Sequence, residues 1–273
     1  MIFLSAALIF TLMIYDICTE TDPGLTRENN EDAIAIDVET QLCILADGMG
    51  GYNAGEIASG MAVAFIKSEM SRWLVQAGKN ANSREVRRAM EICVQNANHS
   101  IYSAANSNPQ YNGMGTTLVM ATFLGDRVMV GHIGDSRCYR LRGDDFQQIT
   151  KDHSLLQEQI DAGLITPEQA LTSINKNLVT RALGVEDTVA LEINEFKVEP
   201  GDLYLMCSDG LSDMVADEPL SKIMMATGEL QHKAKLLVDA ANESGGRDNI
   251  SVVLASANEA ESQRGFLSRM LRK

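Results

Sequence analysis

In Leu42-Cys-Ile-Leu-Ala-Asp-Gly-Met-Gly-Gly51, an apolar run passes directly into an aspartate and a glycine-rich turn, and we interpret the rest of the chain as organised around this segment. An uninterrupted apolar run is typical of a strand that is buried on both faces. Asp47 then stands at the rim of a core, where the glycines let the backbone turn sharply and approach a bound group closely. From Ala54 onward, apolar residues recur at helical spacing, which predicts a helix that packs back on the strand. The stretch alone fits either a strand-turn-helix corner with an exposed aspartate or a ligand site.

Four more acidic residues stand at the end of apolar runs, usually beside a glycine. They are Asp32, Asp135, Asp209 and Asp248. One such acid is ordinary turn chemistry, whereas five predict that the ends of several strands converge. Converged carboxylates repel one another unless cations hold them. Ligands that are all oxygen favour hard cations, so the pattern predicts a site for Mg²⁺ or Mn²⁺.

Composition bounds the remaining possibilities. The chain has 273 residues, of which 45% are hydrophobic and 22% charged, which suits one large domain. A net charge of −14 argues against a protein that binds the phosphate backbone of nucleic acids. The five cysteines form no Cys-x-x-Cys pair and are expected to be buried free thiols in a reducing compartment. The four histidines show no metal-ligand spacing, which argues against zinc.

The two ends of the chain differ in character from the rest. Residues 1–15 are almost wholly apolar, but the run is shorter than the roughly 20 residues that a membrane span needs. We interpret residues 1–12 as an apolar N-terminal extension that precedes a catalytic domain at 13–257; a weak membrane anchor is the rival interpretation. Residues 258–273 form a basic C-terminal tail, which favours a frayed helix over a membrane contact.

Short strands, hairpin turns and helices in separate blocks indicate an α+β fold with antiparallel sheets. Strands are expected at 14–21, 33–38, 41–46, 116–124, 127–132, 137–142, 146–149, 190–198, 203–207 and 249–256, and helices at 54–76, 83–105, 155–162, 167–172, 217–226 and 230–244. Ser83 is expected to be the N-cap of the second helix. The section 154–189 is irregular apart from two short helices, and such a section inside a compact domain is often a functional flap.

Six motifs resemble, in order, those of the metal-dependent type 2C Ser/Thr protein phosphatases, and the match runs from about Asp16 to Ala255. They are Arg27-x-x-x-Glu31-Asp32, Asp47-Gly48-Met49-Gly50-Gly51, Gly115-Thr116-Thr117, Gly134-Asp135-Ser136-Arg137, Ser208-Asp209-Gly210-Leu211 with Asp213, and Gly246-Arg247-Asp248-Asn249. The methionine at position 49 resembles the bacterial branch of the family, since eukaryotic members often carry a histidine at this position. The resemblance implies a four-layer sandwich: two antiparallel β-sheets packed face to face, with helix pairs on both outer sides.

The resemblance also implies the roles of the site residues. Asp47 would bridge two metal ions, Mn²⁺ or Mg²⁺, and the Gly48 carbonyl would bind one of them. By the same resemblance, Asp209 and Asp248 hold the other ion, and Glu31 and Asp32 lie close to the ions and contact them partly through waters. Asp135, Asp209 and Asp213 are implied to form a third, weaker metal position. Arg27 is implied to bind the phosphate. Arg27, Asp47 and Asp209 are the residues expected to carry catalysis. Two hard cations lower the pKa of a bridging water and neutralise the phosphoryl oxygens, so this water would hydrolyse phosphoserine and phosphothreonine.

The implied partners are phosphorylated protein substrates, including targets of a bacterial Ser/Thr kinase and the kinase itself. The chain is expected to be a cytoplasmic monomer that binds neither nucleic acid nor membrane. A phosphatase of narrow specificity, acting on a protein of the anti-sigma-factor-antagonist type, is an alternative that the sequence leaves open. An inactive phospho-binding module is a second alternative, but it would be marked by loss of a metal aspartate, and none is lost.

Several of these residues also have a purely structural interpretation. Arg27 could be a surface ion-pair partner of Glu31, and Asp135 and Asp213 could be turn caps. His153 is interpreted as a hydrogen-bonded core or loop residue rather than a catalytic acid. Thr116 and Thr117 are expected to begin a core strand, and Arg247 and Asn249 to be structural neighbours of Asp248. Many bacterial members have a His-Pro pair and an arginine near 172–176, where this chain has Thr-Ser-Ile-Asn-Lys, so flap contacts are not carried over.

Overall fold

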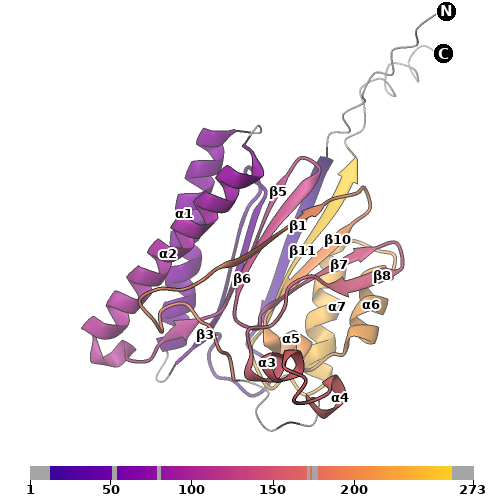
Figure 1. Cartoon of the computed structure of the whole chain (residues 1–273). Helices are drawn as coiled ribbons and strands as arrows, with labels where there is room; N and C mark the ends of the chain where they lie inside the picture. The colour runs from indigo at the N-terminus through magenta and orange to yellow at the C-terminus, as the bar shows by residue number, and fades with distance from the viewer. Residues whose placement is uncertain (1–12, 51–53, 79–80, 171–172, 174–177, 260–273) are drawn as a thin grey trace, which may run out of the picture.

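The protein folds into a sandwich of two antiparallel sheets with helices on both outer faces (Figure 1). This structure, a computed structural model, describes residues 13–50, 54–78, 81–170, 173 and 178–259. Residues 1–12, which we interpret as an N-terminal extension, lie outside the described residues. So do most of residues 258–273, which we interpret as a basic tail. The expected α+β fold and its two antiparallel sheets are confirmed.

The two sheets are named here after one strand of each. The β1 sheet has the order β1 (Met13–Asp22), β11 (Ile250–Glu259), β10 (Leu203–Cys207), β7 (Arg137–Arg142) and β8 (Asp145–Gln148). The β3 sheet has the order β2 (Asp32–Asp37), β3 (Leu42–Met49), β5 (Leu118–Leu124), β6 (Arg127–Ile133) and β9 (Glu192–Lys197), and the short β4 (Gly115–Thr116) pairs with the end of β3. Their strands pair antiparallel throughout.

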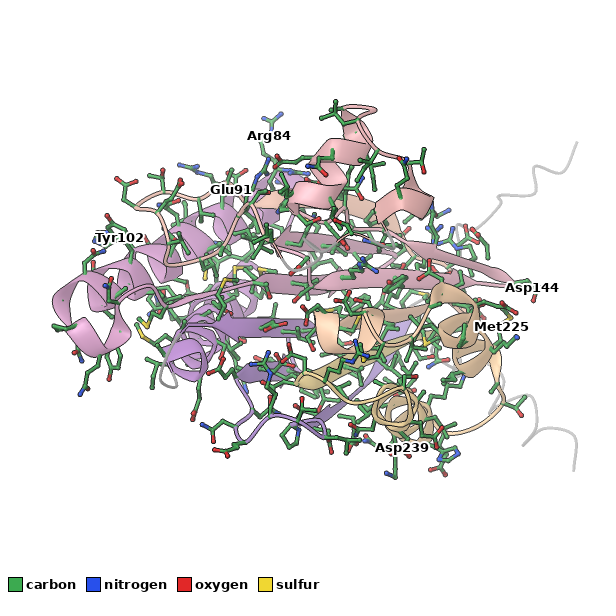
Figure 2. All side chains as sticks on the ribbon, turned by 90° about the horizontal axis from the view of Figure 1, so that it is seen from below. Arg84, Glu91, Tyr102, Asp144, Met225 and Asp239 are labelled. Carbon is green, nitrogen blue, oxygen red and sulfur yellow. The ribbon has the colours of Figure 1, made fainter. Side chains whose placement is uncertain are left out.

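Helices cover the outer face of each sheet (Figures 1 and 2). The helices α1 (Ala54–Ala77) and α2 (Ser83–Ser107) pack on the β3 sheet, and the turn η1 (Pro109–Tyr111) follows them. The helices α5 (Asp209–Ser212), α6 (Asp217–Met225) and α7 (Leu230–Glu243) pack on the β1 sheet, and α3 (Leu155–Asp161) and α4 (Pro167–Ala170) lie in the section 154–189 that was expected to be a flap. Within the described ranges, no helix combines the length and apolarity that a membrane crossing requires.

Strand β3 contributes to two hydrophobic cores at once, as its uninterrupted apolar sequence predicts. Leu42, Ile44 and Ala46 face the core beneath α1 and α2, whereas Cys43 and Leu45 face the core between the sheets. All five side chains are 0% exposed. Full burial of a leucine or isoleucine side chain contributes about 1.5–3 kcal/mol to the stability of the fold. The burial of β3 therefore holds in place the end of the strand, which carries Asp47.

The structure corrects the sequence-based expectation in several short elements. The strand expected at 190–198 begins only at Glu192, and η1 was not expected. The strand expected at 116–124 is divided into β4, which ends at Thr116, and β5, which begins at Leu118. The N-cap of α2 is Asn82, which forms a capping box with Glu85, and not Ser83. Ser83 instead donates a hydrogen bond to Glu195 at 2.7 Å. An element of three residues is too short to show a hydrophobic period, which explains why η1 was missed.

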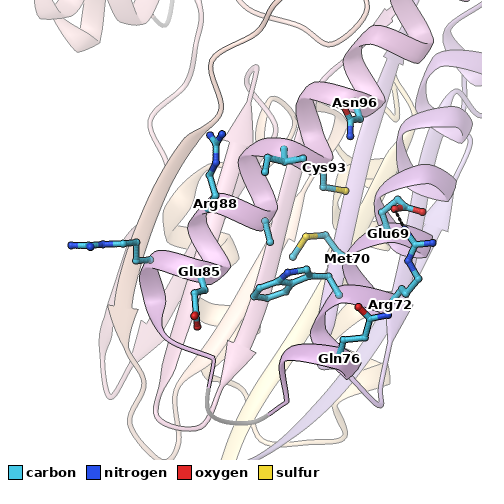
Figure 3. A pocket seen from close by; sticks show the side chains of 12 residues that line it. Glu69, Met70, Arg72, Gln76, Glu85, Arg88, Cys93 and Asn96 are labelled. Atoms are coloured by element: carbon cyan, nitrogen blue, oxygen red, sulfur yellow. Dashed lines mark hydrogen bonds and ion pairs between the residues drawn. The ribbon is translucent and has the colours of Figure 1, made fainter.

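A groove of about 530 Å³ lies between α1 and α2 on the outside of the molecule (Figure 3). Its floor is apolar and includes Met70, Trp73 and Cys93. Of the arginines at its rim, Arg72 pairs with Glu69, and Arg88 lies 3.5 Å from Glu91, so each is matched by an acid of its own helix. With a rise of about 1.5 Å per residue, Trp73 lies nearly 30 Å along α1 from the helix start that contacts the acidic residues. The groove is therefore separate from the candidate site.

Candidate active site

The acidic residues predicted to converge come together at one end of the sandwich. In the β3 sheet, Asp32 is directly opposite Asp47 in the β2–β3 pair. In the β1 sheet, Cys207 at the end of β10 pairs with Arg137 at the start of β7 and with Val252 near the start of β11. Asp209 therefore leaves β10 at the end where Asp135 and Asp248 enter β7 and β11, which is the end where α5 lies (Figure 1).

The pKa values of these carboxyl groups show how strongly they interact. Burial is the largest cause of a raised pKa for Asp47, and its neighbours Asp32 and Asp209 raise it further. The pKa of Asp209 is likewise raised well above its usual value, by burial and then by Asp135 and Asp213. Burial raises the pKa of Asp32 to about 7 and that of Asp135 to about 6. Without a counter-charge, each of these groups therefore keeps its proton to a higher pH than an ordinary aspartate does.

The donor set fits divalent cations. Oδ1 of Asp32 is buried and accepts no hydrogen bond within the described part of the chain, and an orphaned carboxylate oxygen is costly unless something binds it. Asp32, Asp47 and Asp209 keep part of their surface exposed, so a cation and water can reach them even though burial dominates their pKa values. Largely buried carboxylates that lie close together are a set that hard cations stabilise.

Asp47 is held in place through its backbone by two threonines. The Asp47 amide donates to Thr117 Oγ1 at 3.0 Å, and the Thr117 amide donates back to the Asp47 carbonyl at 2.9 Å. Thr116 Oγ1 donates to the same carbonyl at 2.8 Å. Thr117 Oγ1 also lies 2.7 Å from the Ser136 hydroxyl, which links Asp47 to the turn that carries Asp135. Both threonines are buried, so their structural interpretation agrees with the observed contacts.

Gly48 lies where only a glycine fits. A Cβ on Gly48 would lie 2.2 Å from the Gly55 carbonyl oxygen and 2.6 Å from that of Glu31. The Glu31 carbonyl accepts from the Gly48 amide at 3.1 Å and from the Ser59 hydroxyl at 2.6 Å. The first turn of α1 is thus packed against the end of β3 and beside Glu31, which brings Glu31 to the acidic end of the sheet.

Arg27 projects over the acids from the segment before β2. One of its terminal nitrogens, Nη2, lies 2.7 Å from Oδ2 of Asp248, and 51% of the Arg27 side chain is exposed. The alternative in which Arg27 pairs with Glu31 is replaced by this pair with Asp248. An arginine that is half-exposed at the mouth of an acidic site can also reach an anion that arrives from solvent.

Asn249 and Ser208 support the acids, and sequence reasoning assigned no contact to either. Asn249 accepts from the Glu31 amide at 2.7 Å and donates to the carbonyls of Pro23 and Asn29 at 3.0 and 2.8 Å, so it closes the 23–31 segment over the site. Ser208 donates to Oδ2 of Asp32 at 2.8 Å. The only sequence signal for these contacts is that each residue adjoins a motif aspartate.

Asp213 lies at the C-cap of α5, and its amide donates to the Asp209 carbonyl at 2.8 Å. This contact closes a helical turn between Asp209 and Asp213. Asp213 raises the pKa of both Asp209 and Asp135, so Asp135, Asp209 and Asp213 form a second cluster of carboxyl groups next to the first.

Arg137 reinforces the turn that carries Asp135. Its guanidinium donates to both oxygens of Asp152, at 2.7 to 3.1 Å, and to the Tyr139 hydroxyl at 3.1 Å. Gln148 donates to the same carboxylate at 2.8 Å. Asp152 was not among the predicted site residues, although it is the second largest cause of the raised pKa of Asp135.

Comparison with known proteins gives a consistent result. The sequence model described as "Protein phosphatase 2C" matches residues 26–241. The serine/threonine phosphatase stp of Listeria innocua is 36% identical over 241 residues, which cover 87% of this chain and 94% of that protein. The protein phosphatase PhpP of Streptococcus pneumoniae is 36% identical over 251 residues, covering 91% of this chain and all of PhpP.

Solved structures extend the similarity to three dimensions. The crystal structure of the Mycobacterium tuberculosis serine/threonine phosphatase PstP/Ppp has a TM-score of 0.82 and 36% identity, and it covers 90% of this chain and 100% of that chain. The catalytic domain of PstP in complex with two manganese ions has a TM-score of 0.78, with the same identity and coverage. The resemblance inferred from the motifs is confirmed, and the chain belongs to the protein phosphatase 2C family.

Proposed function

We propose that this protein is a metal-dependent phosphatase that hydrolyses phosphoserine and phosphothreonine in proteins. The observation that carries the proposal is the meeting of five strand-end carboxylates, one with a buried oxygen that has no hydrogen-bond partner among the described residues. Relatives that cover most of the chain are named serine/threonine phosphatases, which supports the substrate class.

The proposed ligands of two divalent cations are Asp47, the Gly48 carbonyl, Asp209 and Asp248, with Glu31 and Asp32 close by. PstP binds two manganese ions and supports this number; Mn²⁺ and Mg²⁺ both suit ligands that are all oxygen. When bound, such a pair supplies an activated water near neutral pH and neutralises the phosphoryl oxygens. The chain itself holds the carboxylates in register, through Thr116 and Thr117 on Asp47 and through Ser208 on Asp32.

Arg27 is proposed to bind the phosphoryl oxygens of the substrate. Its planar guanidinium can form two parallel hydrogen bonds with a phosphate. The pair with Asp248 holds it over the acids, and a phosphate dianion offers a stronger partner than a carboxylate that is itself bound to a cation. Arg27 therefore orients the substrate without holding metal.

Asp135, Asp209 and Asp213 are proposed to form a third, weaker cation position. Their mutual effect on pKa supports a shared counter-charge. The two outer acids share only Asp209 with the main pair, and Asp213 is exposed. Such a position exchanges its ion more readily than the main pair does.

The substrates are proposed to be phosphoproteins, including the targets of a bacterial Ser/Thr kinase and the kinase itself. Residues 13–257 are proposed to be the catalytic domain and 154–189 its flap; the chain is proposed to act as a cytoplasmic monomer. The alternative function is that of a narrow-specificity phosphatase that acts on a protein of the anti-sigma-factor-antagonist type. It would use the same catalytic site, because the flap and the outer surface determine which substrate binds. The complete set of acids disfavours an inactive phospho-binding module.

Turnover of a panel of phosphoserine and phosphothreonine peptides, measured with chelator and again after adding Mn²⁺, tests this function. We expect no turnover in chelator and full recovery with Mn²⁺. Full activity in chelator would contradict the mechanism. Turnover of phosphotyrosine peptides but not of phosphoserine or phosphothreonine peptides would contradict the substrate class.

A further inference from the structure

His153 lies outside the acidic cluster, but it forms hydrogen bonds with both the backbone carbonyl and the backbone amide of Gly134, which lies beside the cluster. Its backbone amide donates to the Gly134 carbonyl at 2.9 Å, and its Nδ1 accepts from the Gly134 amide at 3.2 Å. His153 is 7% exposed, so water does not compete freely for these bonds. The residue that follows Gly134 is Asp135.

Gly134 has little freedom to move. Its φ is +97°, and a Cβ there would lie 2.7 Å from Cγ2 of Thr117, the residue that also holds the Asp47 backbone. The turn is therefore gripped from two sides, by Thr117 on the side of Asp47 and by His153 on the other. The position of Gly134 therefore fixes the position of the Asp135 backbone, from which the carboxylate extends.

The ring of His153 is fixed in one tautomer by its partners. Because Nδ1 accepts from Gly134, the proton of the neutral ring is on Nε2, which lies 3.2 Å from Oε2 of Glu192. The ring stacks on that of His132 with centroids 4.6 Å apart, and Nε2 of His132 lies 2.8 Å from the Lys151 carbonyl. Burial, and then His132, lower the pKa of His153, which agrees with a neutral ring.

His153 is also where the flap begins. Its carbonyl accepts from the Thr180 amide at 2.8 Å, and the Leu155 amide donates to the Leu178 carbonyl at 2.9 Å. Between them, Ser154 forms a β-bridge with Val179. The two ends of the flap are thus joined to each other at residues 153–155 and 178–180, and His153 connects this base to Gly134.

We propose that His153 is a positioning residue that couples the base of the flap to Asp135 through the Gly134 amide. The inference rests on the proposed role of Asp135 as a ligand of the weaker cation. A displacement of the flap base moves the His153 ring and backbone together, and the Gly134–Asp135 turn with them. Substrate bound against the flap can in this way change how readily that cation is held.

The same cluster could be taken for a metal site, because ligand atoms of His132, His153 and Glu192 lie within 4.8 Å of one another. Two observations disfavour it. Both ring nitrogens of His153 already have partners, and Nη1 of Arg181, a cation, lies 3.4 Å from Nε2. The geometry therefore favours a support for the turn over a cation site.

Two substitutions separate the contacts of the ring. In His153→Asn, the side-chain oxygen stands where Nδ1 stands and can accept from Gly134, but nothing reaches Glu192. In His153→Gln, the amide reaches the position of Nε2 and Glu192, but the Gly134 amide loses its acceptor. Losing one such hydrogen bond costs about 0.5–1.5 kcal/mol, which corresponds to about a twofold to tenfold effect.

The first readout is hydrogen exchange of the Gly134 and Asp135 amides in metal-free protein, followed by NMR. We expect exchange about tenfold faster in His153→Gln, and a rate near that of the unmutated protein in His153→Asn. The second is the Mn²⁺ concentration for half-maximal phosphopeptide turnover, which should rise in the Gln variant and recover in the Asn variant. Equal behaviour of the two variants would overturn the proposal, as would Zn²⁺ binding that removes the His153 ring signals.

The proposed function has its own control in Asp135→Asn. If that substitution leaves the Mn²⁺ dependence unchanged, Asp135 is not a ligand, and the function proposed for it fails whatever the His153 variants show. If Asp135→Asn changes the Mn²⁺ dependence and His153→Gln does not, only the coupling through His153 fails.

Discussion

Arg27 combines a fixed partner with an exposed guanidinium. Its contact with Asp248 is 2.7 Å, and about half of its side chain faces solvent, so an arriving phosphate can compete for it. Hydrogen bonds to charged groups contribute about 1.5–3 kcal/mol each. We therefore expect Arg27 to affect how tightly the substrate binds more than how tightly the cations bind.

We predict that Arg27→Ala raises the KM for a phosphopeptide by about tenfold or more while the affinity for Mn²⁺ is retained. Steady-state kinetics beside calorimetric metal titration measure both. Arg72→Ala is the matched control, since Arg72 also pairs with an acid but lies on the outer face of α1. Unchanged kinetics in Arg27→Ala, or an equal effect in the control, would remove Arg27 from the site.

At the scale of single elements, the contact of β3 with α1 decides whether the site assembles. The Gly48 position leaves no room for a side chain, because a Cβ there would lie 2.2 Å from a backbone oxygen of α1. Gly60, in the middle of α1, has nothing within 4 Å of a Cβ. The two glycines thus differ in the space around them, which makes them a matched pair.

We predict that Gly48→Ala sharply lowers both the melting temperature and the Mn²⁺ affinity, since β3 and α1 must separate to admit the methyl group. Gly60→Ala should instead stabilise the protein by about 0.5–1 kcal/mol, because alanine restricts the unfolded chain and favours a helix. Thermal unfolding with and without Mn²⁺ measures both effects. A Gly48→Ala variant with ordinary stability would show that the packing is looser than described.

The elements that could be predicted from sequence are those in which apolar residues recur at helical spacing over many residues or form an uninterrupted run. The strand 42–49 and the helices after Ala54 and Asn82 show such patterns, and the strand-end acids follow from them. The support around the acids could not be predicted in the same way. Asn249, Ser208 and His153 act through contacts with residues far away in sequence, and no local pattern encodes such pairs.

At the scale of the whole molecule, the meeting of two sheets places several acids where they repel one another. The pKa of Asp32 is raised to about 7 and that of Asp135 to about 6, so metal-free folded protein binds more protons than the unfolded chain. The contribution of these acids to the stability of the metal-free form is therefore fully present at low pH and is lost as pH rises from about 4 to about 7. Bound cations remove the cause, because they favour the ionised carboxylates.

We predict that the gain in melting temperature on adding Mn²⁺ to chelated protein increases from about pH 5.5 to about pH 8. The comparison at each pH cancels groups far from the acids, such as Asp202, whose pKa is raised by burial but lowered overall by hydrogen bonds, chiefly from Arg142. Differential scanning calorimetry in matched buffers measures the gain. A gain that is constant or falls with pH would show that the acids are not the groups that the cations engage.

Catalysis is expected to depend on cations that the converged carboxylates hold. Calorimetric titration of Mn²⁺ into metal-free protein tests this expectation most directly, with Asp47→Asn beside the unmutated chain. We predict two tight sites in the unmutated protein and loss of tight binding in Asp47→Asn, with an unchanged circular dichroism spectrum and no phosphopeptide turnover. Two sites of equal affinity in the folded Asp47→Asn variant would contradict it.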